Sequence, residues 1–146
     1  MLALLLSVAL SAMPKPPAVP VAAPAQFDWP ARGTITTPFI PGGHDGIDIG
    51  MLRSLKVSAA APGRVRLVGE PRGFEGYGRI VLVDVGGGYS TLYAHLARFS
   101  VRPGAVVTAD QPLGVAGCTG YCSGTHLHFE VRLHGQAVNP ERIPFR

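Results

Sequence analysis

Short runs of apolar and β-branched residues alternate with glycine- and proline-rich breaks through most of the chain. After residue 26 the runs cover residues 34–40, 46–50, 64–70, 78–85, 89–96, 105–108, 113–117 and 126–133. No run keeps a helical period beyond one turn, whereas a period of two recurs, as where three valines alternate with Ile80, Leu82 and Asp84. The pattern predicts an all-β fold, a compact antiparallel sheet or sandwich of short strands.

The first 26 residues differ in composition from the rest. Residues 1–13 are an apolar run, too short to span a bilayer and about the length of a signal-peptide core. Because the run lacks a basic leading segment, a clipped anchor is an alternative, and a buried N-terminal helix is another. Residues 14–26 are rich in proline and alanine and predict an extended spacer. We place the folded domain at residues 27–146, exported to the periplasm or the extracellular side and cell wall, with no stable membrane span in the mature chain.

Composition and charge narrow the class of partner. The 146 residues are 47% hydrophobic and 15% charged, which suits one globular domain. A formal net charge of +4 favours anionic partners, which include nucleic acid, acidic membranes and cell-wall polymers. The basic residues are scattered and form no stripe with aromatic residues, so we expect no nucleic-acid partner.

The two cysteines lie close together, in the segment GCTGYCSG that runs directly into the last apolar run. Their spacing would also suit a metal or redox pair. In an exported protein, however, a disulfide between Cys118 and Cys122 is favoured, and it would close a small glycine-rich loop.

The five histidines offer the most chemistry. In HLHFE, a period of two puts His126 and His128 on one face of a strand, with Cβ atoms roughly 7 Å apart, while Leu127 and Phe129 point toward the core. The alternative is a pair of surface histidines on a solvated edge. His95 follows another predicted strand and can face the same groove, or it is an ordinary histidine at a strand end. The fifth, His134, precedes a glycine and is expected in a hairpin turn.

The segment GGHDGIDIG places His44 four residues before Asp48. Its glycines and β-branched residues disfavour a helix, and in a straight strand the two would lie roughly 13 Å apart. A glycine-permitted bend into a short strand would bring the histidine back over the aspartate. The alternative is an Asx-type turn with a surface histidine.

These residues can supply a catalytic zinc site. Such a site takes three protein ligands from His and Asp or Glu and leaves one position for water. His44, Asp48 and one histidine of the HLH pair make such a set. The two remaining histidines would then be available for proton transfer and charge stabilisation.

The motifs together resemble the lysostaphin-type (LytM-like) zinc metallopeptidases, which are peptidoglycan endopeptidases. The resemblance rests on HDGIDIG, YAHL and GTHLHFEVRLHGQAVNP, in that order, and extends over about residues 33–140. It implies a compact antiparallel β fold with the metal in a narrow groove. It also implies hydrolysis of peptide bonds in the cross-links or stem peptides of bacterial peptidoglycan.

The resemblance assigns roles by position. It implies that His44, Asp48 and His128 bind one zinc ion per chain, and that His95 and His126 flank the water that zinc activates, as general base and as stabiliser, in either order. Glu130, at the far end of the histidine face, is assigned a structural role. Asp45 is expected to be a solvated turn residue.

Two departures from the family pattern concern the groove wall. The segment TTPFIPGGH lacks the usual glycine and arginine, and LRSLKVSA replaces the usual glycine after the aspartate motif. They bear on substrate preference more than on catalysis.

The alternative function is a non-catalytic wall-binding or regulatory module that activates a separate hydrolase. Such relatives typically lose ligand histidines, whereas this chain keeps all five positions. A zinc peptidase that digests proteins is a third reading, and an activating protein partner is compatible with either.

Overall fold

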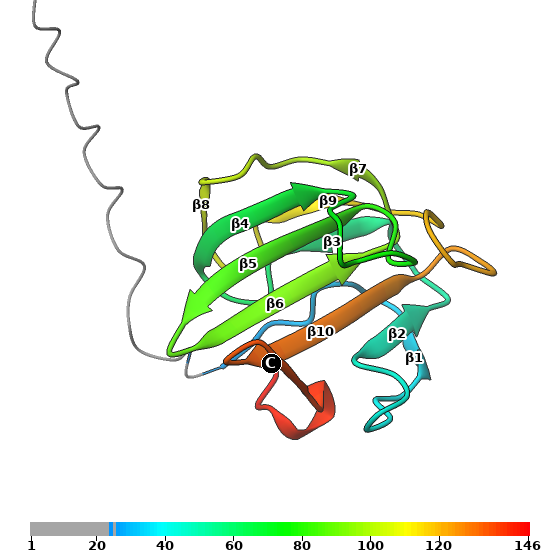
Figure 1. Cartoon of the computed structure of the whole chain (residues 1–146), viewed down its shortest axis with the longest axis horizontal. Coiled ribbons are helices and arrows are strands. Elements are labelled where there is room, and N and C mark those ends of the chain that lie inside the picture. Colours follow the sequence, from blue (N-terminus) through cyan, green and yellow to red (C-terminus); the bar gives the residue numbers. More distant parts are fainter. Residues whose placement is uncertain (1–23, 25) are drawn as a thin grey trace, which may run out of the picture.

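A computed structural model describes residue 24 and residues 26–146. The signal peptide or anchor expected over residues 1–13, and almost all of the spacer expected over residues 14–26, therefore lie outside the described residues. Within the described part, the chain forms eleven strands and one short 3-10 helix, η1 (Pro140–Arg142), which confirms the all-β prediction (Figure 1). No helix in this part of the chain is long and apolar enough to cross a membrane.

The larger of two antiparallel sheets has eight strands. Their spatial order is β1-β2-β10-β6-β5-β4-β8. The eighth strand, β11, pairs with residues 131–133 of β10, beyond the residues of β10 that pair with β2. The strands are β1 (Thr34–Thr37), β2 (Ile47–Gly50), β4 (Gly63–Gly69), β5 (Ile80–Gly86), β6 (Tyr89–Ala94), β8 (Val106–Val107), β10 (Leu127–Leu133) and β11 (Gln136–Val138). In Figure 1 the four long strands β4, β5, β6 and β10 run side by side across the molecule.

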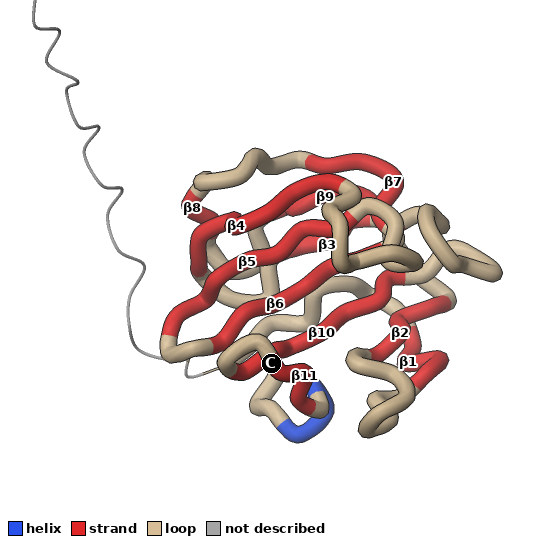
Figure 2. The backbone as a smooth tube through the Cα atoms, in the orientation of Figure 1, coloured by secondary structure: helices blue, strands red, loops and turns tan. Residues whose placement is uncertain are grey.

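The smaller sheet has three strands, in the order β3-β9-β7. They are β3 (Lys56–Ser58), β9 (Pro112–Ala116) and β7 (Leu96–Phe99). The tube in Figure 2 shows how little of the domain is helical, and how much loop connects the strand ends on the side of β2 and β9.

The main hydrophobic core lies between the sheets. It includes Val81 and Val83 of β5, Val57 of β3 and Leu113 of β9, none of which has measurable exposed surface. The opposite face of β5 forms a second cluster, in which Ile80 and Leu82 pack under residues 74–77 of the β4–β5 loop. The alternation predicted for β5 therefore reflects a strand buried on both faces.

The pattern of YSTLYAHL predicts one strand, but the structure divides this segment into two, β6 and β7. It divides at His95, whose φ of 59° lies in the left-handed region and reverses the pleat. The His95 N–H donates to the carbonyl of Tyr77, and the Leu96 N–H donates to that of Arg79, so the break is held by the β4–β5 loop. As a result β6 stays in the large sheet, whereas β7 turns away and pairs with β9.

Candidate metal centre and active site

The register of the large sheet places two of the motifs on one face. In the antiparallel pairing of β2 with β10, Asp48 lies directly opposite His128, and on the other side of β10 the partner of His128 is Ala94 of β6. Residues directly opposite in such a pair share a face. The next residue after Ala94 is His95. The strand order β2-β10-β6 therefore brings together HDGIDIG, YAHL and HLHFE, which are far apart in the sequence.

Three donor atoms converge at this point. Asp48 Oδ1 lies 2.8 Å from His128 Nδ1 and 3.2 Å from His44 Nε2, and the two histidine nitrogens are 3.1 Å apart. This cluster fits a cation, because each residue offers one ligand atom and the three atoms lie within 4.8 Å of one another. Two imidazole nitrogens and one carboxylate oxygen form a donor set typical of catalytic zinc. Metal ligation by these residues stays a prediction.

Hydrogen bonds on the far sides of both imidazoles select the ligand nitrogens. His44 Nδ1–H donates to the carbonyl of Pro38 at 2.8 Å, which leaves the lone pair on Nε2. His128 Nε2–H donates to Glu130 Oε1 at 3.0 Å, so Nδ1 becomes the ligand atom once it loses the proton that it donates to Asp48. Outer contacts of this kind orient metal-binding histidines and fix their tautomers.

The bend that carries His44 is a tight turn closed before β2 begins. The backbone N–H of His44 donates to the carbonyl of Ile40 at 2.8 Å, and Gly42 takes the left-handed conformation with φ of 72°. Gly46 serves a different purpose, because a Cβ at this position would lie 2.3 Å from the carbonyl oxygen of Phe129. Glycine is needed there so that β2 can approach β10 closely. The bend predicted from the sequence is thus present.

Glu130, for which the sequence predicts a structural role, contacts the candidate ligand His128 directly. The side chain is fully buried and accepts hydrogen bonds from Tyr77 Oη–H at 2.7 Å, from His128 Nε2–H and from Arg132 Nε–H. Burial would raise the pKa of Glu130, but these three bonds hold it below its usual value. The period of two that unites residues 126, 128 and 130 was the signal for this contact.

The pKa values of the central pair reflect their mutual contact. Burial alone would raise the pKa of Asp48, but hydrogen bonds from His128 and Thr37 lower it to about 2. Burial would lower the pKa of His128, but its hydrogen bonds with Asp48 and Glu130 raise it to about 9. A cation bound at His128 Nδ1 therefore has to displace a proton.

The two remaining histidines of the motifs lie beside this cluster. Their ring centroids are 4.7 Å apart, and His126 Nε2 is 3.7 Å from Asp48 Oδ1. His95 Nδ1–H donates to the carbonyl of Thr119, and His126 Nδ1–H donates to that of Gly124, each at 2.7 Å. In the neutral form of either ring, the lone pair is therefore on Nε2. Burial lowers the pKa of His95, which favours the neutral, proton-accepting form.

A groove of about 890 Å³ opens over these side chains. Its walls are the turn before β2, the β4–β5 loop and the loop between β9 and β10, which projects beyond the strand ends in Figure 1. Asp45 lies exposed on the groove rim, as expected for a turn residue. His134 is exposed in the β10–β11 turn with φ of 50°, which confirms the predicted hairpin and leaves it outside the groove.

A disulfide joins Cys118 and Cys122 in the loop between β9 and β10, as predicted. The loop packs closely against the β4–β5 loop: a Cβ on Gly120 would lie 2.4 Å from the backbone of both Gly76 and Gly78. Sequence reasoning missed that backbone carbonyls of this loop orient His95 and His126, because a carbonyl acceptor leaves no signature in the sequence.

A sequence profile described as Peptidase family M23 matches residues 42–140. The matched region contains the bend with His44 and Asp48, the strand break at His95 and the HLH motif. It thus includes all of the residues that converge on the groove.

Two characterised relatives have different activities in their names. The murein hydrolase activator NlpD of Escherichia coli is 37% identical over 116 residues, which cover 78% of this chain and 30% of NlpD. The DD-carboxypeptidase/endopeptidase Mpg of Neisseria meningitidis is 40% identical over 100 residues, which cover 68% of this chain and 22% of Mpg. The chain therefore spans less than a third of either relative.

The fold also matches solved structures. A zinc-containing peptidase from Vibrio cholerae aligns with a TM-score of 0.71 and 27% identity, over 86% of this chain and 41% of that protein.

Proposed function

The chain belongs to Peptidase family M23, and from this membership and the geometry of the groove we propose that it is a zinc metalloendopeptidase that hydrolyses peptide bonds of bacterial peptidoglycan. One observation carries the proposal: the ligand atoms of His44, Asp48 and His128 lie close together while two further histidines, each with Nδ1 held by a backbone carbonyl, border the same groove. A domain that only bound the wall would need no such set of oriented imidazoles.

In this proposal His44 Nε2, Asp48 Oδ1 and His128 Nδ1 hold the zinc ion. Zinc in such a site acts as a Lewis acid that polarises a carbonyl and lowers the pKa of water. The chain contributes the orientation of its ligands. Pro38 fixes His44, and Glu130 fixes His128, so that neither imidazole has to reorganise when the ion binds.

His95 and His126 move the proton. Hydrolysis of an amide requires a base that takes a proton from the attacking water and an acid that gives one to the leaving nitrogen. Either Nε2 can take the proton, because the Nδ1–H of each ring is held by a backbone carbonyl. The second imidazole, in the form that carries a proton on Nε2, would donate that N–H to the carbonyl oxygen on which negative charge develops.

Peptidoglycan as the substrate is supported by the names of both relatives, one a murein hydrolase activator and the other a DD-carboxypeptidase/endopeptidase. Acting on this polymer requires export, which the Cys118–Cys122 disulfide also favours. The net charge of +4 would keep the protein near an anionic wall.

A second candidate function is activation of a separate wall hydrolase, and the 37% identity to NlpD supports it. Such an activator would use the groove or its rim to bind a partner protein instead of cleaving a peptide. Metal binding and cleavage by the isolated chain distinguish the two functions.

The first experiment measures zinc. We expect the purified chain to bind one zinc ion and to gain thermal stability from it, since a ligand that binds only the folded state stabilises it. His128→Ala should abolish both effects. His134→Asn is the matched control, because this exposed residue lies at a left-handed turn position that asparagine tolerates. Normal zinc binding by His128→Ala would overturn the ligand assignment.

The second experiment measures cleavage. The zinc-loaded chain is incubated with purified peptidoglycans of several cross-link types, and the released fragments are analysed by mass spectrometry. Fragments with a new amine and a new carboxyl at one peptide bond, absent with His128→Ala, are the expected result. Failure to cleave any wall, together with faster cleavage by an added wall hydrolase, would favour the activator.

A further inference from the structure

The loop between β9 and β10, residues 117–126, supplies the acceptors for both proton-transfer histidines. The carbonyl of Thr119 accepts from His95 Nδ1–H, and the carbonyl of Gly124 accepts from His126 Nδ1–H, each at 2.7 Å. His95 itself belongs to the connection between β6 and β7, so the loop reaches across to a residue from another part of the sheet. One loop therefore sets the plane and tautomer of both rings.

The metal cluster takes its orientation from elsewhere. The outer hydrogen bond of His44 goes to Pro38, that of His128 goes to Glu130, and Asp48 is held in β2 by its register with β10. None of these contacts involves residues 117–125. The site thus has two separately supported halves, one for the metal and one for proton transfer.

Several contacts hold this loop in place. The disulfide joins Cys118, next to Thr119, with Cys122, two residues before Gly124. Thr119 Oγ1–H donates to the carbonyl of Leu96 at 2.9 Å, and Thr119 Oγ1 accepts from the backbone N–H of Arg79 at 3.0 Å. Without such restraints, the loop residues would regain backbone conformational freedom.

We infer that the Cys118–Cys122 bridge and the Thr119 hydroxyl are positioning elements for catalysis, which hold the Nε2 atoms of His95 and His126 toward the groove and contribute nothing to metal affinity. This inference rests on the proposed function. It separates the residues that act through the loop from those that act through zinc.

The first test removes the bridge with Cys118→Ser and Cys122→Ser in one chain. We expect zinc affinity, measured by competition with a chelator, to stay within about threefold, since the ligands lie on other elements. Turnover of the cleaved wall peptide should fall about 10- to 100-fold, because a displacement of about 1 Å in a catalytic group can cost that much. The KM should change less than kcat. Zinc affinity lost in parallel with turnover, or turnover unchanged, would overturn the inference.

A second test keeps the disulfide and changes only the hydroxyl. Thr119→Val has nearly the same shape but lacks both hydrogen bonds of the side chain, whereas Thr119→Ser retains them. We expect Thr119→Val to lose turnover with normal zinc binding and Thr119→Ser to recover most of it. Equal turnover in the two variants would contradict a positioning role.

A third readout does not depend on activity. Long-range proton–nitrogen NMR correlations report which ring nitrogen carries the proton. In the zinc-loaded wild type, His95 and His126 should both give the Nδ1–H pattern, and in the double serine variant both patterns should average or broaden while that of His128 persists. Unchanged patterns for His95 and His126 in the double serine variant would overturn the inference, whether or not the wild-type chain cleaves any wall. Absence of cleavage by the wild-type chain would count against the proposed function alone.

Discussion

The Nε2–H of His128 donates a 3.0 Å hydrogen bond to Oε1 of Glu130, a carboxylate with no exposed surface. This contact turns Nδ1 of His128 toward Asp48, and Nδ1 becomes a ligand atom once it loses its proton. Tyr77 and Arg132 hold the carboxylate in turn. The proposed metal ligand His128 is therefore oriented by three residues that the zinc ion would not touch.

Glu130→Gln tests this support. The substitution keeps the volume but allows the amide to present its N–H₂ group to His128, so that the imidazole is no longer held as the Nε2–H tautomer. We expect zinc affinity to fall about 10- to 100-fold, the usual effect of losing an outer partner of a ligand histidine. Chelator competition measures it.

The matched control is Glu141→Gln, which removes an exposed carboxylate in η1 and should leave zinc affinity unchanged. Wild-type affinity in Glu130→Gln would mean that the sheet alone orients His128.

Gly46→Ala tests the close approach of β2 to β10. The added Cβ would lie 2.3 Å from the carbonyl oxygen of Phe129, and backbone has to move to relieve the contact. We expect a loss of about 1–3 kcal/mol in the free energy of unfolding, as for other overpacked interiors, together with weaker zinc binding. Urea denaturation measures the stability.

The control is Gly124→Ala, whose Cβ would meet no atom within 4 Å and whose φ is not in the left-handed region. It should change the free energy of unfolding by less than about 0.5 kcal/mol. Equal stability of the two variants would contradict the steric argument.

Much of the fold and the candidate site could be predicted, because both depend on local patterns. The period of two in HLHFE placed His126 and His128 on one face, and the alternation in residues 80–85 predicted a strand. The all-β class followed from these patterns, and the resemblance to zinc metallopeptidases is confirmed by the match to Peptidase family M23.

The remainder depends on contacts between distant segments. Nothing local requires His95 to adopt a positive φ; the break comes from hydrogen bonds to the carbonyls of Tyr77 and Arg79. The strands β3, β7 and β11 are short, and their pairing partners define them more than their own sequences do. Likewise Asp48 lies opposite His128 through the sheet register, which no spacing within the chain expresses.

Tyr93 provides a test of the core at high pH. Its buried hydroxyl accepts from the backbone N–H of Ala60 at 2.8 Å and donates to Thr91 Oγ1 at 3.0 Å. Burial raises the pKa of Tyr93 to about 12, against about 10 in the unfolded chain. Stability from this group is complete below about pH 10 and is lost as the pH rises toward 12, because the unfolded state releases the proton first.

We expect Tyr93→Phe to lower the free energy of unfolding by about 1–3 kcal/mol at neutral pH, since the Ala60 N–H loses its partner. Above about pH 10 the wild type should lose stability more steeply than the variant, by about 2–3 kcal/mol in total. Urea denaturation at a series of pH values measures both effects. Parallel profiles for the two proteins would show that Tyr93 ionises equally in the folded and unfolded states.

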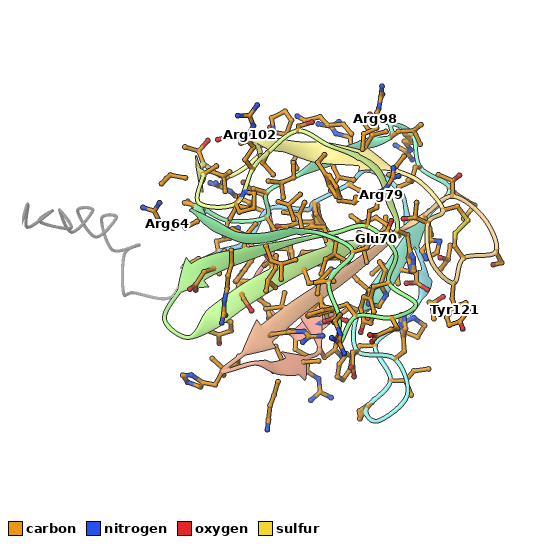
Figure 3. The ribbon with its side chains drawn as sticks, turned by 45° about the horizontal axis from the view of Figure 1, so that its top comes forward. Arg64, Glu70, Arg79, Arg98, Arg102 and Tyr121 are labelled. Atoms are coloured by element: carbon orange, nitrogen blue, oxygen red, sulfur yellow. A yellow bond between two sulfur atoms is a disulfide. The ribbon has the colours of Figure 1, made fainter. Side chains whose placement is uncertain are left out.

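Tyr121 is the aromatic residue best placed to meet a substrate. Its side chain is 88% exposed on the loop between β9 and β10 (Figure 3), and it lines the groove beside Gly76. The backbone N–H of Tyr121 donates to the carbonyl of Gly76 at 2.8 Å, so the loop keeps its place whatever the side chain is. An exposed ring next to the reacting groups gains stability when a bound peptide covers it.

We expect Tyr121→Ala to raise the KM for the cleaved wall peptide about 5- to 30-fold, which corresponds to about 1–2 kcal/mol of apolar contact. The kcat should change little, because the carbonyls that orient His95 and His126 belong to Thr119 and Gly124. Tyr121→Phe keeps the ring and should retain most of the affinity. A fall in kcat without a change in KM would instead place Tyr121 among the groups that support proton transfer, and an unchanged KM in the alanine variant would show that the substrate does not reach this side of the groove.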